Sequence, residues 1–338
     1  MNESEIERGL GTAEPRVDTE AALARLRTRI EDEGVVAAPP AIRRRVPARW
    51  LQGLAAAAGV VLVASALTLS GVADSILKIF EPRSIVGVPV TQQDLNYLGQ
   101  ACAGLDLQQC MGTYGTFEWT TPPQPKEVQS LASASSTAGY SVQTPSSLPA
   151  SVTGPTRYGV INRSSATFTF SAGATQQAAT RQGRTAPPMP ANMDGSHLYM
   201  TAGPAVFQVW GAPASTGRGP QPDPIPTLVV GQAKAPVVTS DGVTVDQLRT
   251  YLLQQPGVSP QLAAAIRAIG DPASTLPVPV PAELAVSHPV TVQGVQGLFI
   301  GDNTGIASAI IWQKDGMMFE VIGSLTERQA VDIANSMR

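Results

Sequence analysis

One uncharged stretch of 24 residues, Trp50–Ala73, constrains this chain more than any other feature of its sequence. As a helix rising about 1.5 Å per residue, it is long enough to cross the roughly 30 Å hydrocarbon layer of a membrane. In lipid the backbone has to form its hydrogen bonds within the segment, and a helix does this. The alternative is a buried helix of a water-soluble domain, but such helices seldom exceed about 18 residues without a charge. We therefore predict a transmembrane helix over 50–73.

The charges that flank this stretch predict its orientation. Arginines precede it, whereas the charges that follow it sum to zero. The residues concerned are Arg43, Arg44, Arg45 and Arg49 before the stretch, and Asp74, Lys78, Glu81 and Arg83 after it. Because excess positive charge stays in the cytoplasm, we expect the tail 1–49 inside and residues 74–338 outside a plasma membrane. A cleaved signal peptide is the alternative, since VASA and GVA resemble cleavage sites. The 49-residue leader and the length of the apolar run favour an uncleaved, single-pass anchor.

Composition limits the possible partners. The tail 1–49 carries 9 arginines and 9 acidic residues, and residues 74–338 carry 14 basic and 17 acidic residues, giving a net charge of −3. Without a basic stripe, nucleic-acid binding is not expected. The 29 prolines and 31 glycines indicate short elements joined by many turns. We divide the outer part into a juxtamembrane segment and linker over 74–134 and an α+β domain over 135–338.

Both cysteines, Cys102 and Cys110, fall on the predicted outer side, and the tail has none. This distribution suits an oxidising exterior and predicts a local disulfide. Closing so short a loop stabilises the fold by roughly 2–3 kcal/mol in the chain-entropy description. Two unpaired thiols are the alternative.

One helix is predicted in the tail, over Val17–Glu33. Leu23, Leu26 and Ile30 form an apolar stripe at i, i+3 and i+7, and Asp18 or Thr19 suits the N-cap. A lone amphipathic helix is marginally stable in water. It therefore stays partly folded, lies on the membrane, or docks on a cytoplasmic partner through this stripe.

The first half of the outer part reads as short strands and helices. We expect an amphipathic turn over 73–80, a strand over 84–91, a short helix from Thr91 with Asp94, and a helix over Lys126–Ala138. Two hairpins follow. The first pairs Tyr158–Ile161 with Ala166–Phe170, and the second pairs His197–Thr201 with Ala205–Val209 around Gly203-Pro204.

The second half is better defined. A strand at Thr227–Val230 precedes two helices that form a helical hairpin insertion. Thr244 and Gln247 make a capping box for the first helix, and Ser259-Pro260 and Gly270 bound the second. TLPVPVPAE over 275–283 is extended. Antiparallel strands then fall at 290–292, 297–300, 307–312 and 317–322, with a tight turn at Asp315-Gly316. A last helix, capped by Ser324 and Glu327, carries Ala330, Ile333 and Ala334. The fold class is α+β.

The sequence contains no recognisable pair of a catalytic base and a nucleophile. His197 and His288 are the only histidines, and neither lies near a cysteine, so neither a zinc site nor another metal site is expected. Ser196-His197 reads as the start of a strand, and Asp302-Asn303 as a hairpin turn rather than a calcium loop. Trp210 and Trp312 are assigned to the core. The sequence predicts no enzymatic activity and no cofactor.

The stretch DTEAALARLRTRI before a single span resembles the cytoplasmic helical segment of bacterial membrane-anchored anti-sigma factors. AGYSVQTPSSLP, ATFTF and the run VTVQGVQGLFIGDNTGIASAIIWQKDGMMFEVIGSL resemble an extracytoplasmic domain of unknown function often attached to such regulators. The tail lacks the His-x-x-x-Cys-x-x-Cys zinc module that many anti-sigma factors carry. The resemblance implies that the outer domain senses the envelope and that Leu23, Leu26 and Ile30 hold a sigma factor or another cytoplasmic regulator.

Two further functions remain open. In one, the curved apolar sheet with its helical insertion leaves a groove, and the protein is an anchored binding module for a lipid, lipoprotein or wall component. In the other, it is a structural envelope protein without a ligand. The partners expected are therefore the lipid bilayer, a sigma factor or other regulator, and an envelope ligand.

Overall fold

A computed structural model of the full chain describes residues 77–91, 94, 111–112, 114–211, 227–303, 305 and 307–338. All of them belong to one compact unit, Ala48–Arg338. The predicted tail helix over 17–33, the predicted span over 50–73, and Cys102 and Cys110 lie outside the described residues. Within the described ranges, no helix combines the length and the apolar character needed to cross a membrane.

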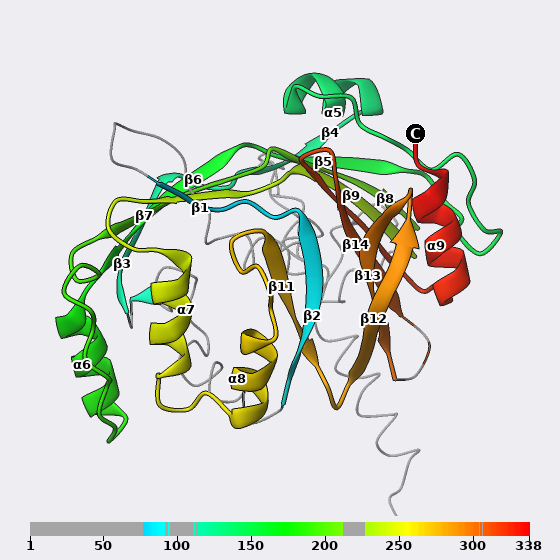
Figure 1. The fold of residues 1–338 in the computed structure, drawn as a ribbon. Helices are drawn as coiled ribbons and strands as arrows, with labels where there is room; N and C mark the ends of the chain where they lie inside the picture. Colours follow the sequence, from blue (N-terminus) through cyan, green and yellow to red (C-terminus); the bar gives the residue numbers. More distant parts are fainter. Residues whose placement is uncertain are drawn as a thin grey trace, which may run out of the picture. The chain divides into compact units, whose positions relative to one another are not determined.

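Two antiparallel sheets form most of the described structure (Figure 1). The five-stranded sheet has, in spatial order, β1 (Leu77–Phe80), β10 (Val237–Ser240), β7 (His197–Ala202), β6 (Ser164–Phe170) and β3 (Gly115–Thr121). The eight-stranded sheet has β12 (Ala285–Val292), β13 (Val295–Asp302), β14 (Ser308–Lys314), β15 (Met317–Gly323), β9 (Leu228–Lys234), β8 (Ala205–Trp210), β5 (Arg157–Ile161) and β4 (Pro125–Val128). The predicted α+β class with antiparallel sheets is confirmed.

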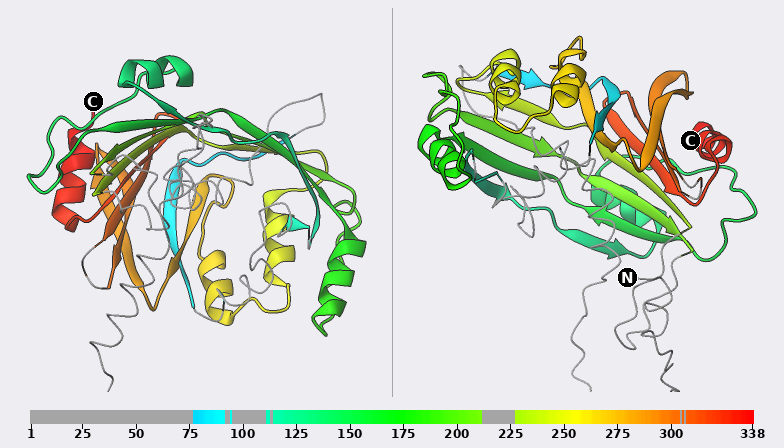
Figure 2. Two further views of the ribbon diagram at one scale, coloured as in Figure 1. Left: turned by 180° about the vertical axis from the view of Figure 1, so that it is seen from behind. Right: turned by 90° about the horizontal axis from the view of Figure 1, so that it is seen from below.

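The chain passes directly between these sheets at four short connections. They join β3 to β4, β5 to β6, β7 to β8, and β9 to β10, and the joined strands occupy matching positions in the two sheets. Three connections contain proline, at Pro122-Pro123, Pro204 and Pro236. Proline has no N–H to donate, so it ends a ladder at any position whose N–H would face a neighbouring strand. The two sheets therefore meet along one bend, crossed by four nearly continuous strands (Figure 2).

Both hairpins predicted around this bend are wrong, although their four strands exist. β5 pairs with β4 and β8, and β6 pairs with β3 and β7, so β5 and β6 do not pair. Likewise β7 pairs with β6 and β10, and β8 with β5 and β9. The connections at Asn162-Arg163 and Gly203-Pro204 carry the chain across the bend and do not reverse it. At the first, the Asn162 side chain donates to the Pro122 carbonyl at 3.3 Å and joins two neighbouring crossings.

A third sheet has two parallel strands, β2 (Ser84–Val90) and β11 (Thr275–Pro281), which confirms both predicted extended segments. Prolines occupy every second position of β11 from Pro277 to Pro281. Alternate N–H groups of a strand point to opposite edges, so Leu276, Val278 and Val280 supply the N–H groups toward β2. Pro277, Pro279 and Pro281 then lie at positions whose N–H would face the unpaired edge, and that edge is blocked from pairing.

The described part of 74–134 joins the same fold as the domain predicted over 135–338. β1 pairs with β10, β2 with β11, β3 with β6, and β4 with β5. The amphipathic helical turn predicted over 73–80 is a strand from Leu77 onward. Thr91 and Asp94 exchange hydrogen bonds, with the Asp94 carboxylate accepting from the Thr91 amide at 2.9 Å. The short helix predicted to start at this pair lies almost entirely outside the described residues.

Five helices are described: α5 (Leu131–Ala138), α6 (Ala172–Arg181), α7 (Val245–Leu253), α8 (Pro260–Arg267) and α9 (Glu327–Ser336). The capping box of α7 and the Ser259-Pro260 start of α8 are confirmed. Three predicted boundaries are wrong. α5 begins only at Leu131, because Ser130 caps it and the preceding residues pair as β4. α8 ends at Arg267, before Gly270. α9 is capped by Thr326 with Gln329, two residues beyond the predicted box.

The two faces of the eight-stranded sheet are covered differently. On its outer face α9 buries Ala330, Ile333 and Ala334 against Trp312, which confirms the predicted core roles of these residues. Trp210 belongs to the same cluster. α5 covers the outer face nearer β5. On the inner side of the bend lie α7, α8 and the two-stranded sheet (Figures 1 and 2).

Candidate functional site

A cavity of about 350 Å³ lies between α7, α8, β11 and the inner face of the five-stranded sheet. Its volume falls within the range of small-molecule sites. Nearly all of its lining is apolar. This cavity is the candidate functional site, and three walls of different construction enclose it.

The first wall is the inner face of the five-stranded sheet. Phe80 of β1, Leu198 of β7 and Val238 of β10 supply it, and all three are buried. Phe80 lies opposite Val238 in the register of β1 and β10, and β10 pairs in turn with β7. The wall is rigid because each of its side chains stands on a paired strand.

The second wall comes from the two helices. Val245, Leu248 and Leu252 repeat at i, i+3 and i+7 along α7, and Ile266 faces them from α8. The capping box at Thr244 fixes where α7 begins and therefore which side chains face inward. Leu252 stands at the rim and is 39% exposed, which is high for a leucine of this helix face.

The third wall is β11, from which Thr275, Pro277 and Pro279 face the cavity. Leu276 and Val278, between them, point the other way into the main core. The alternating TLPVPVP sequence thus gives one strand two apolar faces. Pro277 and Pro279 are exposed because the space in front of them is open.

The polar side chains that line the cavity already form hydrogen bonds or ion pairs with other residues of the protein. The Thr275 hydroxyl lies 3.0 Å from the Ser84 hydroxyl. Arg249 pairs with Asp246 at 2.9 Å and donates to the Ile269 carbonyl at 3.4 Å. A ligand in this cavity would therefore gain affinity from removal of apolar surface from water, not from specific hydrogen bonds.

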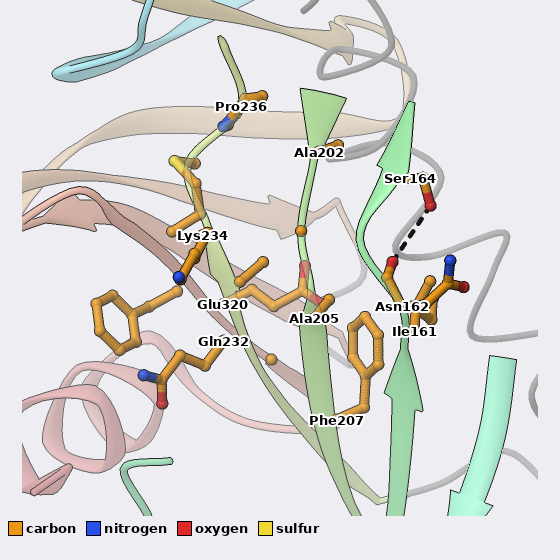
Figure 3. A pocket seen from close by; sticks show the side chains of 15 residues that line it. Ile161, Asn162, Ser164, Ala202, Ala205, Phe207, Gln232, Lys234, Pro236 and Glu320 are labelled. Atoms are coloured by element: carbon orange, nitrogen blue, oxygen red, sulfur yellow. Dashed lines mark hydrogen bonds between the residues drawn. The ribbon is translucent and has the colours of Figure 1, made fainter. Parts of the chain in front are cut away.

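A second cavity lies at the bend, on the inner face of the eight-stranded sheet, and measures only about 40 Å³. Glu320 of β15 is its acidic residue. Figure 3 shows this carboxyl directed toward Ala205 of β8. It passes over Gly231 of β9, where a Cβ atom would lie 2.5 Å from Glu320 Oε1. The space is large enough for a water molecule but not for an organic ligand.

Glu320 is 5% exposed, and its Oε2 has no hydrogen-bond partner among the described residues. Burial raises the pKa of this carboxyl to about 7, because the ionised form loses its hydration inside the protein. Glu320 is therefore a buried acid that holds its proton in mildly acidic solution. The sequence analysis did not identify it.

The two histidines each lie beside a carboxylate. His197 begins β7, as predicted, and its Nδ1 lies 2.6 Å from Asp241 Oδ2. Burial alone would raise the Asp241 pKa, but hydrogen bonds from His197 and Tyr199 outweigh it and lower that pKa. His288 Nε2 lies 2.9 Å from Glu327.

Across the described ranges, no three His, Cys, Asp or Glu side chains gather as a possible metal site. Asp302 accepts from the Ala307 amide within a turn between strands.

The structure brings together cavity residues that the sequence analysis assigned only to separate elements. The sequence predicts the two helices from their capping residues and β11 as an extended segment, and it does not say which of their faces meet. Nothing in the sequence near these elements predicts that a cavity separates them from the five-stranded sheet. The predicted partner-binding residues Leu23, Leu26 and Ile30 and the predicted disulfide Cys102–Cys110 lie outside the described residues.

A comparison of the chain with models of known protein families finds no match, and a comparison with curated proteins also finds none. The resemblance to membrane-anchored anti-sigma factors therefore stays a prediction from sequence.

Proposed function

We propose that this protein is a membrane-anchored envelope binding module that holds the apolar chain of a lipid-like ligand in the cavity under the five-stranded sheet. The observation that carries the proposal is the cavity itself: about 350 Å³, with apolar walls from β1, β7, β10, β11, α7 and α8. An apolar space of this size open to water is costly unless something fills it.

The volume also limits the ligand. It lies near the lower end of the range for small-molecule sites. One acyl-type chain suits this space better than several chains packed side by side. Each methylene group moved from water into such a wall contributes about 0.8 kcal/mol. A single chain can therefore be held without any fixed polar contact.

The membrane-anchored part of the proposal is supported by sequence. Residues 50–73 have the length and apolar character of a span, and the arginines before them favour a cytoplasmic tail. The module then stands outside the cell, and its ligand is an envelope component. Protease added to intact cells should degrade the body and leave the tail, and an intact body would contradict this orientation.

Photolabelling tests the binding function. The full chain is placed in zwitterionic lipid nanodiscs and illuminated with a dodecanol that carries a diazirine on its chain. We expect the label on peptides of α7, α8 and β11. Leu252→Trp should reduce that labelling severalfold, because the indole fills the mouth of the cavity. Leu148→Trp is the matched control, since Leu148 is 37% exposed and does not line the cavity. Labelling that ignores the cavity peptides, or that both variants affect equally, would contradict the proposal.

A second candidate function is regulatory, and it rests on the tail sequence. Leu23, Leu26 and Ile30 form an apolar stripe with no other predicted element in the tail to bury it. We propose that this stripe binds a sigma factor or another cytoplasmic regulator. The full chain should co-purify a sigma factor, and Leu23→Asp with Ile30→Asp should abolish this. Leu10→Asp with Val35→Asp is the control outside the stripe. Loss with both double variants, or with neither, would argue against the regulatory role.

A further inference from the structure

Arg249 borders two spaces at once. It lines the apolar cavity, and it also lines a neighbouring polar cleft of about 300 Å³. The cleft is bounded by Thr250, Leu253 and Gln254 of α7 and its C-terminal end and by Arg267 of α8. A ligand whose chain occupies the cavity therefore has a polar space next to it, with a guanidinium at the boundary.

The charge of this cleft is positive. Arg249 is paired with Asp246 at 2.9 Å, and that ion pair is neutral as a unit. Arg267 is exposed and has no ion-pair partner among the described residues. No acidic side chain lines the cleft. One uncompensated positive charge remains, beside a boundary arginine whose donors are only partly used.

The two arginines are placed there by the helices that form the cavity. Arg249 lies one residue after Leu248, so it stands at the edge of the apolar face of α7. Arg267 lies one residue after Ile266, at the end of α8. Each helix thus presents an apolar side chain to the cavity and the next residue, an arginine, to the cleft. A guanidinium suits phosphate or carboxylate oxygens, because it offers several donors in a fixed plane.

We infer that the ligand is an anionic amphiphile, with its chain in the apolar cavity and its phosphate or carboxylate head between Arg249 and Arg267. This inference rests on the proposed binding function and adds the chemical class of the ligand. A neutral amphiphile would leave the cleft charge uncompensated, and a cationic one would be repelled by it. The required recognition chemistry is thus a single negative head on an apolar chain.

Two photoprobes with the same diazirine chain test the inference, one ending in phosphate and the other in an alcohol. Each is applied to the full chain in zwitterionic nanodiscs, and the label on α7, α8 and β11 is quantified. Arg267→Gln should lower labelling by the dodecyl phosphate roughly tenfold, the size expected for loss of one charge-assisted contact, and leave labelling by the dodecanol unchanged. Arg328→Gln is the matched control, because Arg328 is an exposed arginine on α9, away from the cleft.

The outcomes separate the inference from the function on which it rests. If the dodecanol fails to label the cavity, the binding function itself is wrong. If both probes label the cavity and Arg267→Gln affects neither, binding stands and the anionic head is wrong. Inorganic phosphate at the concentrations that saturate the phosphate probe should not compete, and full competition would overturn the need for a chain. Arg267 also suits the C-terminal end of α8, so thermal unfolding of Arg267→Gln is measured alongside. Equal losses with both probes would overturn a direct role in binding the head.

Discussion

The inner face of the bent sheet is filled at one end and hollow at the other. On the inner face of the eight-stranded sheet, the cavity that Phe207 and Glu320 line measures only about 40 Å³ among the described residues. Under the five-stranded sheet, the helices and β11 leave about 350 Å³. Both ends present buried apolar strands, so the strands themselves do not explain the difference. The two ends differ in the elements that pack against the inner face of the sheet.

At the hollow end, the elements that face the sheet are held in place by contacts of their own. β11 is fixed by seven registered residue pairs with β2, and α7 is fixed by its capping box. Neither can move onto the sheet without breaking these contacts. At the filled end, buried side chains of β5, β8 and β9 pack against one another in a single cluster. We therefore expect the filled end to supply stability and the hollow end to supply ligand space, and four experiments can break or sharpen this division.

The largest difference is expected from truncation at the two ends. Phe207→Ala should cost about 3–5 kcal/mol of unfolding free energy, because it empties a buried ring position in a packed cluster. Leu252→Ala, at the rim of the large cavity, should cost about 1 kcal/mol or less, since its side chain is already partly in water. Denaturant unfolding of the full chain followed by tryptophan fluorescence measures both. Equal costs would show that the two ends are packed alike.

Glu320 provides the second experiment, through the pH dependence of stability. An unfolded glutamate ionises near 4.5, whereas burial raises the pKa of Glu320 in the folded protein to about 7. The folded state therefore binds the proton more tightly, so wild-type stability falls as pH rises from 4.5 through 7. Relative to Glu320→Gln, we expect a loss of about 3 kcal/mol between pH 4 and pH 8.

The comparison with Glu320→Gln isolates this one carboxyl, because both proteins share every other titrating group. Unfolding is measured in urea across the pH range, and the difference in free energy is plotted. A flat difference would mean that the carboxyl is hydrated or paired in solution. A wild-type stability that falls toward acid relative to Glu320→Gln would have the opposite sign and would contradict the burial of Glu320.

Enlargement gives the third experiment, with the same change made at both ends. Val229→Phe, at the filled end, should cost about 1–3 kcal/mol by overpacking. Val238→Phe points into the large cavity and should be neutral or stabilising by about 1 kcal/mol, because the ring fills existing space. The second variant should also exclude the dodecanol photoprobe. If Val238→Phe destabilises as much as Val229→Phe, the hollow end has no space to fill.

Sequence reasoning succeeded where contacts are local. The turn at Asp315-Gly316 was predictable because both residues favour positive φ, and they have φ values of 51° and 73°. The capping box at Thr244 was equally local. At α9 the pattern was ambiguous: Ser324 with Glu327 and Thr326 with Gln329 both fit it, and the structure uses the second.

Sequence reasoning failed where partners are distant. A two-residue connection such as Asn162-Arg163 is the usual sign of a hairpin, yet its strands pair with β3, β4, β7 and β8. Nothing local distinguishes a chain that reverses from one that bends and continues into a second sheet. The cavity was unpredictable for the same reason, since it is a separation between elements whose apolar faces looked like ordinary core. Glu320 sits among apolar residues in MMFEVIG, and only the neighbouring strand shows that Gly231 leaves room for it.

The smallest effect is expected at the proline wall, where two prolines on strands can be compared. Pro279→Ala on β11 and Pro289→Ala on β12 should each cost about 0.4–1 kcal/mol, because alanine restores freedom to the unfolded chain. Only Pro279 lines the large cavity. Its ring supplies part of the apolar wall, so Pro279→Ala alone should reduce labelling by the dodecanol probe, by about twofold to fourfold for one or two lost methylene contacts. Equal labelling of the two variants would mean that β11 closes the cavity only through its backbone. Loss of labelling in Pro289→Ala would mean that the ligand space extends to the far edge of the eight-stranded sheet.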